Sequence, residues 1–410
     1  MKKLIFFFLI SSLFNHFLFS QTWVQKLAGI GMWSLAKSPQ GKIFAGASGT
    51  IKGIFRSTNG GETWDTALIA SVNVLYLACD SLNGVYATYG SGGLMKSTDG
   101  GNNWTNIPGS VFGNKTVQSV ACGKNGYVYV GAVTGGIFRS TDGGLTFPDT
   151  ALTGLTIVSL TVDRFNSNYV YAGASSASAP NLGFYRSTNA GLTFSANLNP
   201  LNIWAILQKN NHNLYTVTTS SGYPFSKSTD LGLNWSTVSS LSGAMRGACL
   251  DMAENIYTSG NGGVFRSTND GLSFYNAGLT VSSNHSISYQ NRILTAAAGT
   301  SNGGVWIYVD STLSGISTPN SVPVKTELMQ NYPNPFNSAT KIKYKINLNC
   351  LVSIKVYDIS GKEISTLVNG IKKAGVHEVI FEGSALSSGI YLYRIVTSVN
   401  SETRKMMHIK

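Results

Sequence analysis

Carboxylates are the side chains of this chain that could carry out hydrolysis, because most glycoside hydrolases need two carboxyl groups about 5–10 Å apart. A repeated segment carries an aspartate or an asparagine at one fixed position. Further acids, including Asp80, Asp163 and Asp251, fall at turns elsewhere in the same repeats. The loops expected to surround a ligand contain no Asp or Glu apart from Asp65 and Asp149, which directly follow outer strands. No carboxylate pair can be assembled, so no catalytic residue is assigned.

A second set of side chains could hold a ligand without reacting with it. Aligning the repeats places one residue of each repeat in a single column, at the start of the first strand and near the mouth of a central channel. Two indoles, a guanidinium, an amide and an imidazole in this column can stack on and hydrogen-bond to a sugar or a peptide. The alternative is that some of them pack between repeats. The column contains Trp33, Leu75, Gln118, Val158, Trp204, Arg246 and His285, of which Trp33, Gln118, Trp204, Arg246 and His285 are the candidate ligand-binding residues.

No pattern indicates a metal or a cofactor, and none is expected. The four cysteines show no zinc-type spacing with each other or with histidine. Cys79 and Cys122 occupy equivalent places in successive repeats, which favours small buried side chains. A single repeated carboxylate among backbone groups is a poor calcium cage. Neither His212 nor His285 stands in an evident nucleophile–base pair.

The elements that position these side chains are set by a decapeptide that recurs six times, with its serines 40, 43, 47, 41 and 39 residues apart. This period is typical of the four-stranded blade of a β-propeller. Each copy predicts a hairpin turn, because Asp and Asn bond to nearby backbone amides and Gly supplies a positive φ. The residues given this structural role are Ser57, Asn59, Gly61, Trp64, Ser97, Asp99, Gly101, Trp104, Asp142, Gly144, Asn189, Gly191, Asp230, Gly232, Trp235, Asn269 and Gly271.

A seventh set of strands, over residues 285–289, 292–297 and 304–309, lacks the decapeptide and a fourth strand. The missing strand is expected at the other end, because residues 22–25 resemble the segment that starts at Thr63. We therefore predict an all-β fold with a seven-bladed propeller over residues 21–309, closed by the N-terminal strand. The alternative is a six-bladed ring with a loose tail.

The decapeptide pattern, S-x-[D/N]-x-G-x-x-[W/F], resembles the Asp box of sialidases, xyloglucan-degrading enzymes and photosystem assembly-factor propellers. The resemblance implies that the boxes lie on the face opposite the ligand. It also implies three inward arginines in a sialidase, whereas only Arg164, Arg246 and Arg292 lie outside the boxes of the propeller. The leading hypothesis is therefore a non-catalytic propeller that binds a polysaccharide or a protein. The alternative is a glycoside hydrolase-like enzyme with an atypical site.

The C-terminal part has a different pattern. Residues 310–327 read as a linker, and the alternating segments 341–346, 352–357, 377–381 and 390–395 predict a small β-sandwich over residues 328–410. The segments 331–337, 356–363, 388–393 and 405–410 closely resemble the type A sorting domain of type IX secretion. That resemblance implies a Bacteroidota-like organism, passage through the periplasm, and display at the outer-membrane surface or release, with the secretion machinery as the partner of residues 328–410.

The N-terminal residues predict export as well. Lys2 and Lys3 precede a mostly apolar segment over residues 4–19, which favours a cleaved signal peptide over residues 1–20. No other segment approaches transmembrane length. The net charge of +12 does not indicate nucleic-acid binding, because residues 21–324 hold 16 basic and 12 acidic residues and show no concentrated basic patch. We expect an exported protein whose oligomeric state and ligand the sequence leaves open.

Overall fold

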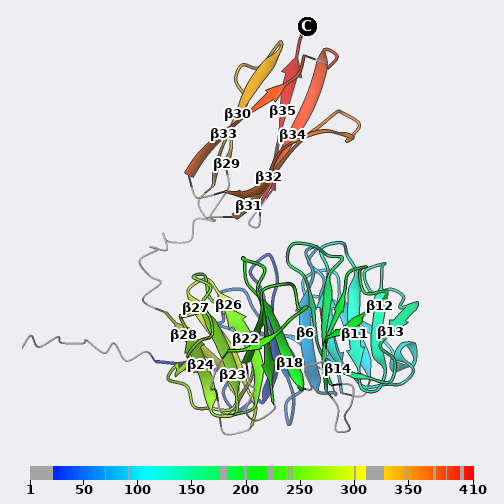
Figure 1. The fold of residues 1–410 in the computed structure, drawn as a ribbon, viewed down its shortest axis with the longest axis vertical. Coiled ribbons are helices and arrows are strands. Elements are labelled where there is room, and N and C mark those ends of the chain that lie inside the picture. Colours follow the sequence, from blue (N-terminus) through cyan, green and yellow to red (C-terminus); the bar gives the residue numbers. More distant parts are fainter. Residues whose placement is uncertain are drawn as a thin grey trace, which may run out of the picture. The chain divides into compact units, whose positions relative to one another are not determined.

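The structure is a computed structural model with two compact units, one within residues 22–310 and one within residues 327–410. The regular secondary structure described in both consists of β-strands and one short 3-10 helix (Figure 1). The expected signal peptide lies outside the described residues, as does most of the expected linker. The residues that the structure describes are 22–69, 71–90, 92–175, 182–197, 201–219, 225–238, 241, 243–299, 302–310, 327–346, 350–372, 375–384, 386–397 and 401–410.

The first unit is a β-propeller of seven four-stranded antiparallel sheets, as the repeat period predicts. Blades 1 to 3 contain β2 (Met32–Lys37), β3 (Ile43–Ala47), β4 (Gly53–Ser57), β5 (Asp65–Ile69); β6 (Val74–Cys79), β7 (Val85–Tyr89), β8 (Gly93–Ser97), β9 (Thr105–Ile107); and β10 (Val117–Cys122), β11 (Val128–Ala132), β12 (Gly136–Ser140), β13 (Asp149–Ala151). Blades 4 to 6 contain β14 (Thr156–Val162), β15 (Val170–Ser175), β16 (Gly183–Ser187), β17 (Ser195–Asn197); β18 (Ile203–Gln208), β19 (Leu214–Thr218), β20 (Phe225–Ser228), β21 (Ser236–Thr237); and β22 (Met245–Leu250), β23 (Ile256–Gly260), β24 (Gly263–Ser267), β25 (Tyr275–Asn276). Blade 7 contains β26 (Ser283–Tyr289), β27 (Arg292–Ala297), β28 (Gly304–Val309) and β1 (Val24–Lys26), and a short 3-10 helix, η1 (Gly109–Phe112), connects blades 2 and 3.

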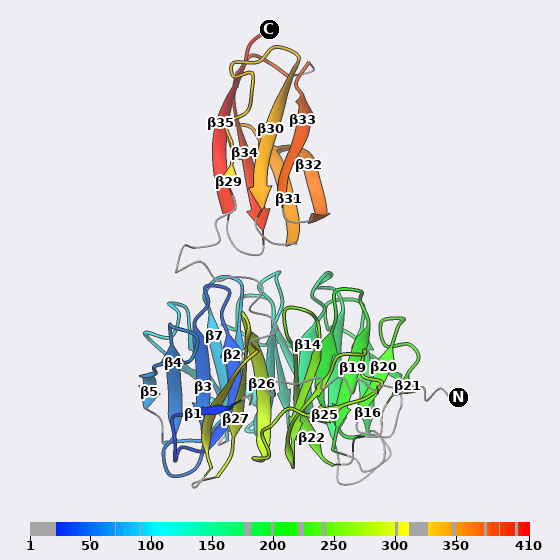
Figure 2. The ribbon, with the colours of Figure 1, turned by 90° about the vertical axis from the view of Figure 1, so that its left-hand side faces the viewer.

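The ring closes through the N-terminal strand. The inner strands contact one another in order from β2 to β26, and β26 returns to contact β2. In blade 7, β1 pairs antiparallel with β28, with Val24 opposite Ile307. The indole of Trp23 donates a hydrogen bond of 2.7 Å to the carbonyl of Ala277 in the neighbouring connection. Figure 2 shows β1, in blue, beside the yellow-green strands of blade 7. The predicted closure is confirmed, and the six-bladed alternative is wrong.

Each decapeptide forms the turn between the third and fourth strands of its blade. In blade 1, Ser57 Oγ accepts the backbone N–H of Gly61 at 2.9 Å, and the same hydroxyl donates to Asn59 Oδ1 at 3.0 Å. Asn59 Oδ1 also accepts the backbone N–H of Thr63 at 3.0 Å. In blade 2 the carboxylate of Asp99 accepts the equivalent N–H of Asn103 at 2.9 Å. Asp and Asn are interchangeable here because the turn needs one acceptor oxygen.

The glycine two residues after the Asp or Asn of each turn also contacts the neighbouring blade. Gly101 has a φ of 82°, and a Cβ added to it would lie 2.6 Å from the ring of Phe44 in blade 1. The equivalent Gly191 of blade 4 would place a Cβ 2.5 Å from the ring of Tyr129 in blade 3. A glycine is therefore required both by the backbone conformation and by the close approach of the next blade.

Acidic residues at the turns between the first and second strands cap the backbone. Asp80 Oδ1 accepts the N–H groups of Leu82 at 2.8 Å and Gly84 at 2.7 Å. Asp163 and Asp251 make equivalent bonds to the amides of their own turns. These hydrogen bonds stabilise the turns and give the three carboxylates a structural role.

The second unit consists of two facing sheets in the order β29-β30-β33 and β32-β31-β34-β35. Its core includes Phe336, Tyr344, Ile354 and Tyr393. The side chain of Asn331 is buried and donates to the carbonyl of Pro333 and to Thr340 Oγ1, both at 3.0 Å, which fixes the segment that resembles a sorting motif. The strands are β29 (Glu327–Leu328), β30 (Ala339–Ile346), β31 (Cys350–Tyr357), β32 (Glu363–Lys372), β33 (Gly375–Glu382), β34 (Gly389–Thr397) and β35 (Ser401–His408).

Candidate functional site

The candidate site begins with a β-bulge that recurs in the inner strand of every blade. In blade 1 the pairing of β2 with β3 shifts register between Met32 and Ser34, which leaves Trp33 without a partner. Such a bulge re-aims the extra side chain. The bulged residues are Trp33, Leu75, Gln118, Val158, Trp204, Arg246 and Asn284.

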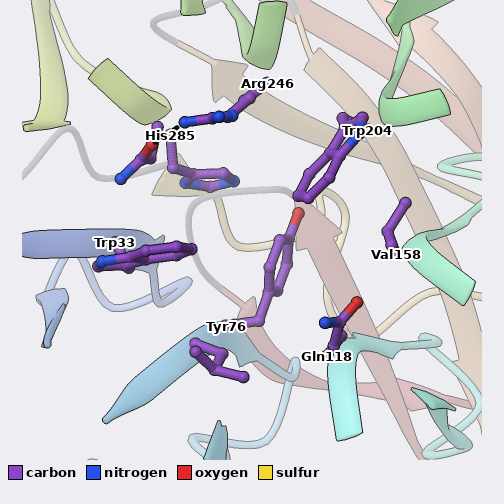
Figure 3. Close-up of a pocket in the computed structure, with 9 residues that line it drawn as sticks. Trp33, Tyr76, Gln118, Val158, Trp204, Arg246 and His285 are labelled. Carbon is purple, nitrogen blue, oxygen red and sulfur yellow. Dashed lines mark hydrogen bonds between the residues drawn. The ribbon is translucent and has the colours of Figure 1, made fainter. Parts of the chain in front are cut away.

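All of these residues line one pocket, together with Tyr76 and His285. The structure thus brings together the five candidate residues of the sequence analysis, Trp33, Gln118, Trp204, Arg246 and His285. Figure 3 shows Tyr76 between Trp33 and Trp204, with Arg246 and His285 together on one side. The cavity has a volume of about 80 Å³, and the Trp33 side chain at its rim is 40% exposed.

One position of the predicted column is wrong. In blade 7 the register shift falls between Ser283 and His285, so the bulged residue is Asn284. His285 pairs with Ala296 and corresponds to Ser34 of blade 1, which pairs with Gly46. His285 nevertheless lines the pocket, because its imidazole extends into the channel from the next position of the strand.

Tyr76 and His285 line the pocket from the position that directly follows the bulged residue of their strands. They belong to blades 2 and 7, on either side of blade 1, and their rings meet edge to face with centroids 5.2 Å apart. Contact across an intervening blade requires both rings to extend into the channel. The equivalent position carries a small residue in the remaining blades, namely Ser34, Ser119, Ser159, Ala205 and Gly247. Tyr76 was not among the residues predicted from the sequence, although a large residue in a column of small ones is a visible signal.

The imidazole of His285 is neutral at physiological pH. Its Nδ1 accepts the backbone N–H of Leu35 at 3.2 Å, and burial lowers its pKa from 6.5 to about 4. The single proton of the neutral ring is therefore on Nε2. Burial also raises the pKa of Tyr76 to about 12, so its phenol keeps its proton.

Arg246 is the charged residue among those that line the pocket. Its Nη1 donates to Asn284 Oδ1 at 3.2 Å, and its guanidinium carbon lies 5.9 Å from the ring centroid of Trp204. Asn284 is buried and donates in turn to the carbonyl of Met32 at 3.4 Å. No ion pair of the described residues includes Arg246, and no carboxylate lines the pocket.

The other two arginines outside the repeated turns are used elsewhere. Arg164 is exposed at a turn and donates to the carbonyl of Gln208 at 3.1 Å. Arg292 forms an ion pair of 2.6 Å with Glu62 in the repeated turn of blade 1. The structure therefore does not gather the three arginines into one anion-binding group.

Other candidate chemical groups are engaged in the fold. Burial raises the pKa of the Cys79 thiol to about 12, which removes its nucleophilic character at neutral pH. His212 packs against Phe165 with tilted rings whose centroids are 4.3 Å apart, and it does not line the pocket. Among the described residues, no cluster of three His, Cys, Asp or Glu side chains has a geometry suited to a metal ion.

Comparison with known families identifies the second unit. Residues 330–410 match the secretion system C-terminal sorting domain. This domain directs type IX secretion to the cell surface or the extracellular space, and it engages the machinery of that pathway. No curated protein sequence matches the chain significantly. Within the described residues, no helix is long and apolar enough to cross a membrane.

Solved structures share the propeller fold at low sequence identity. YCF48 bound to D1 peptide is 15% identical over 70% of this chain and 96% of its own, with a TM-score of 0.55. A catalytically inactive virginiamycin B lyase from Staphylococcus aureus with quinupristin is 15% identical over 70% of this chain and 98% of its own, with a TM-score of 0.56. The extracellular domain of the hybrid two-component system BT3049 from B. thetaiotaomicron is 14% identical over 95% of this chain and 57% of its own, with a TM-score of 0.54. These similarities show the fold alone.

Proposed function

We propose that the propeller is a non-catalytic binding module whose ligand, a polysaccharide or a protein, docks in the axial pocket. The observation that carries the proposal is the bulge column. The same backbone feature recurs in all seven blades, yet it presents two indoles, a guanidinium and two amides at the pocket. A purely structural column would be expected to repeat one side chain, as the turns of the decapeptides do.

The propellers of similar fold are consistent with this role. One was solved with a peptide and another with quinupristin, so the fold accommodates ligands of different chemistry. Binding pockets are commonly concave and apolar with a few directed polar groups. The axial pocket of this chain fits that description, because Leu75 and Val158 line it beside the polar residues.

The export route completes the proposed function. Residues 1–20 act as a cleaved signal peptide, residues 328–410 engage the secretion machinery of a Bacteroidota-like organism, and the propeller reaches the surface or the medium. The last strand, β35, contributes Met406 to the core of the sorting domain and pairs along β34. Removing residues 405–410 should hold the protein in the periplasm, which fractionation of the native host would detect. Normal appearance at the surface would contradict this part of the proposal.

The glycoside hydrolase alternative lacks a reacting group at the pocket. Retaining and inverting enzymes both place carboxyl groups beside the scissile bond. Here the pocket is lined by no Asp or Glu, and the carboxylates of Asp80 and Asp163 accept backbone amides at turns.

The test is a binding screen of the purified protein against glycan and peptide arrays, with hydrolysis followed in parallel. For any ligand found, Trp204→Ala and Arg246→Ala should each weaken binding at least fivefold, since truncation of a buried anchor commonly costs more than about 1 kcal/mol. Leu145→Ala is the matched control, because Leu145 is 72% exposed on a repeated turn. Equal loss in the control, or hydrolysis of the ligand, would contradict the proposal.

A further inference from the structure

Three groups around the pocket can donate hydrogen bonds to a ligand. The guanidinium of Arg246 can only donate, and the neutral His285 presents Nε2–H because Leu35 N–H occupies its Nδ1. The Tyr76 hydroxyl adds a third donor at the centre of the pocket (Figure 3). With no carboxylate among the lining residues, the pocket has one positive charge and no internal counter-charge. An anionic group of a ligand would supply both the missing counter-charge and the acceptors for these donors.

The position of Arg246 is fixed before a ligand arrives. Asn284 holds Nη1 at 3.2 Å and is itself anchored to the carbonyl of Met32, while the indole of Trp204 lies beside the guanidinium. A preorganised guanidinium loses little conformational freedom when it binds a carboxylate, and its fork matches the two carboxylate oxygens.

The depth of the pocket limits what can enter. The rings of Tyr76 and His285 meet in the channel, with centroids 5.2 Å apart, and narrow it at this level. The pocket is small and is lined by a residue from each of the seven blades, so it seats one terminal group of a longer ligand. The ligand therefore enters end-on.

The two indoles favour a sugar as that terminal group. Trp33 and Trp204 belong to blades 1 and 5, which lie across the ring of seven blades from each other. Indole faces stack on the C–H face of a pyranose, and an exposed indole at the rim offers such a surface.

We propose that the axial pocket recognises a uronic acid at the end of a glycan chain. This inference rests on the proposed binding function and names its ligand class. The carboxylate of the sugar accepts from Arg246 and His285 Nε2, its ring stacks on an indole, and a hydroxyl bonds to Tyr76.

The experiment is isothermal titration of the purified protein with trigalacturonate, trimannuronate, methyl-esterified trigalacturonate and cellotriose. An octapeptide with a free or an amidated C-terminus forms a parallel arm. A uronate trimer should bind, its affinity should fall as salt is raised, and neither the methyl ester nor cellotriose should bind within tenfold of it. Arg246→Gln should weaken uronate binding at least tenfold, and Arg246→Lys should weaken it less. Arg164→Gln removes the same charge from an exposed turn and should leave binding unchanged.

The outcomes separate the inference from the function it rests on. Ester, cellotriose or peptide binding that Trp204→Ala weakens and Arg246→Gln does not would overturn the uronate inference and leave the binding function standing. Binding that neither substitution weakens, or no binding by any of these probes, would overturn both the uronate inference and the binding function. Tyr76→Phe is a finer test, because it keeps the ring that contacts His285 and removes one hydroxyl. It should weaken uronate binding about threefold, and an unchanged affinity would remove Tyr76 from the contact.

Discussion

The repeated turns and the bulge column occupy equivalent positions in successive blades, yet they differ in how their residues vary. Every repeated turn keeps a serine, an Asp or Asn and a glycine, because each of these side chains satisfies a bond or a close contact within the fold. The bulge column keeps its backbone and changes its side chain in almost every blade. Chemical uniformity thus accompanies a structural task, and variation on a uniform backbone accompanies a site that one asymmetric ligand can read.

The largest expected effect is on the closure that holds both regions in one ring. Deleting residues 21–26 removes β1, exposes the edge of β28 and leaves blade 7 with three strands. An open edge can pair with another chain, so we expect aggregation and a melting temperature lower by several degrees. Size-exclusion chromatography and thermal unfolding measure both. A monomer with an unchanged melting curve would show that the ring does not depend on β1.

The second prediction tests whether a repeated turn stabilises the contact between blades. Gly101→Ala places a Cβ against Phe44 and should lower the free energy of unfolding by about 2–4 kcal/mol. Gly126→Ala is the control, since Gly126 also has a positive φ, 79°, but has nothing within 4 Å of an added Cβ. Its free energy of unfolding should fall only by the cost of placing an alanine at a positive φ, about 1–2 kcal/mol. Equal losses in chemical denaturation would mean that the contact between blades contributes nothing.

The third prediction concerns the bulge region and its pH dependence. Burial lowers the pKa of His285 to about 4, so as the pH falls below 6.5 the unfolded chain binds a proton that the folded chain does not. The stability contributed by the neutral ring is complete above about pH 6.5 and is lost between there and about pH 4. In His285→Asn, an amide oxygen replaces Nδ1 as acceptor for Leu35, and this loss should disappear. His212→Asn, at an exposed position, should keep the wild-type profile. Identical melting profiles for wild type and His285→Asn from pH 7 to pH 4 would contradict the prediction.

The periodicity of the sequence allowed the blades and the closing strand of the propeller to be predicted. The spacing of the serines gave the blades, and the likeness between residues 22–25 and the segment at Thr63 located the closing strand. The column was assigned one residue too late in blade 7, because that blade has no decapeptide to anchor the alignment. The bulge also interrupts the alternation of inward and outward side chains that would otherwise fix the register. Strands β32 and β35 were not among the predicted alternating segments, and in β35 the exposed positions include both Lys405 and Met407. Tyr76 was missed because its role depends on contact with His285, far away in the chain.

The smallest effect is expected from exchanging Asp for Asn within a repeated turn. Asp99 Oδ1 accepts the backbone N–H groups of Asn102 and Asn103, and these bonds hold its pKa well below the usual range. Asn59 makes the equivalent bond with an amide oxygen. Asp99→Asn should therefore melt within error of the wild type at pH 7, with the Asn103 amide turned to present its oxygen. Asp99→Ala, which has no acceptor, should melt lower.

Calcium and pH also test whether the repeated turns have only a structural role. Added calcium or a chelator should change neither the wild type nor Asp99→Asn, because one carboxylate among backbone amides offers too few oxygen ligands. Acid should distinguish the wild type from Asp99→Asn. The stability that the Asp99 carboxylate contributes is present above its unfolded pKa of 3.8 and is lost as the pH falls below it, whereas an asparagine does not titrate. A calcium-dependent rise in the melting temperature that Asp99→Asn removes would instead make the repeated turns ion sites, and the distinction between a uniform structural region and a varied binding region would no longer hold.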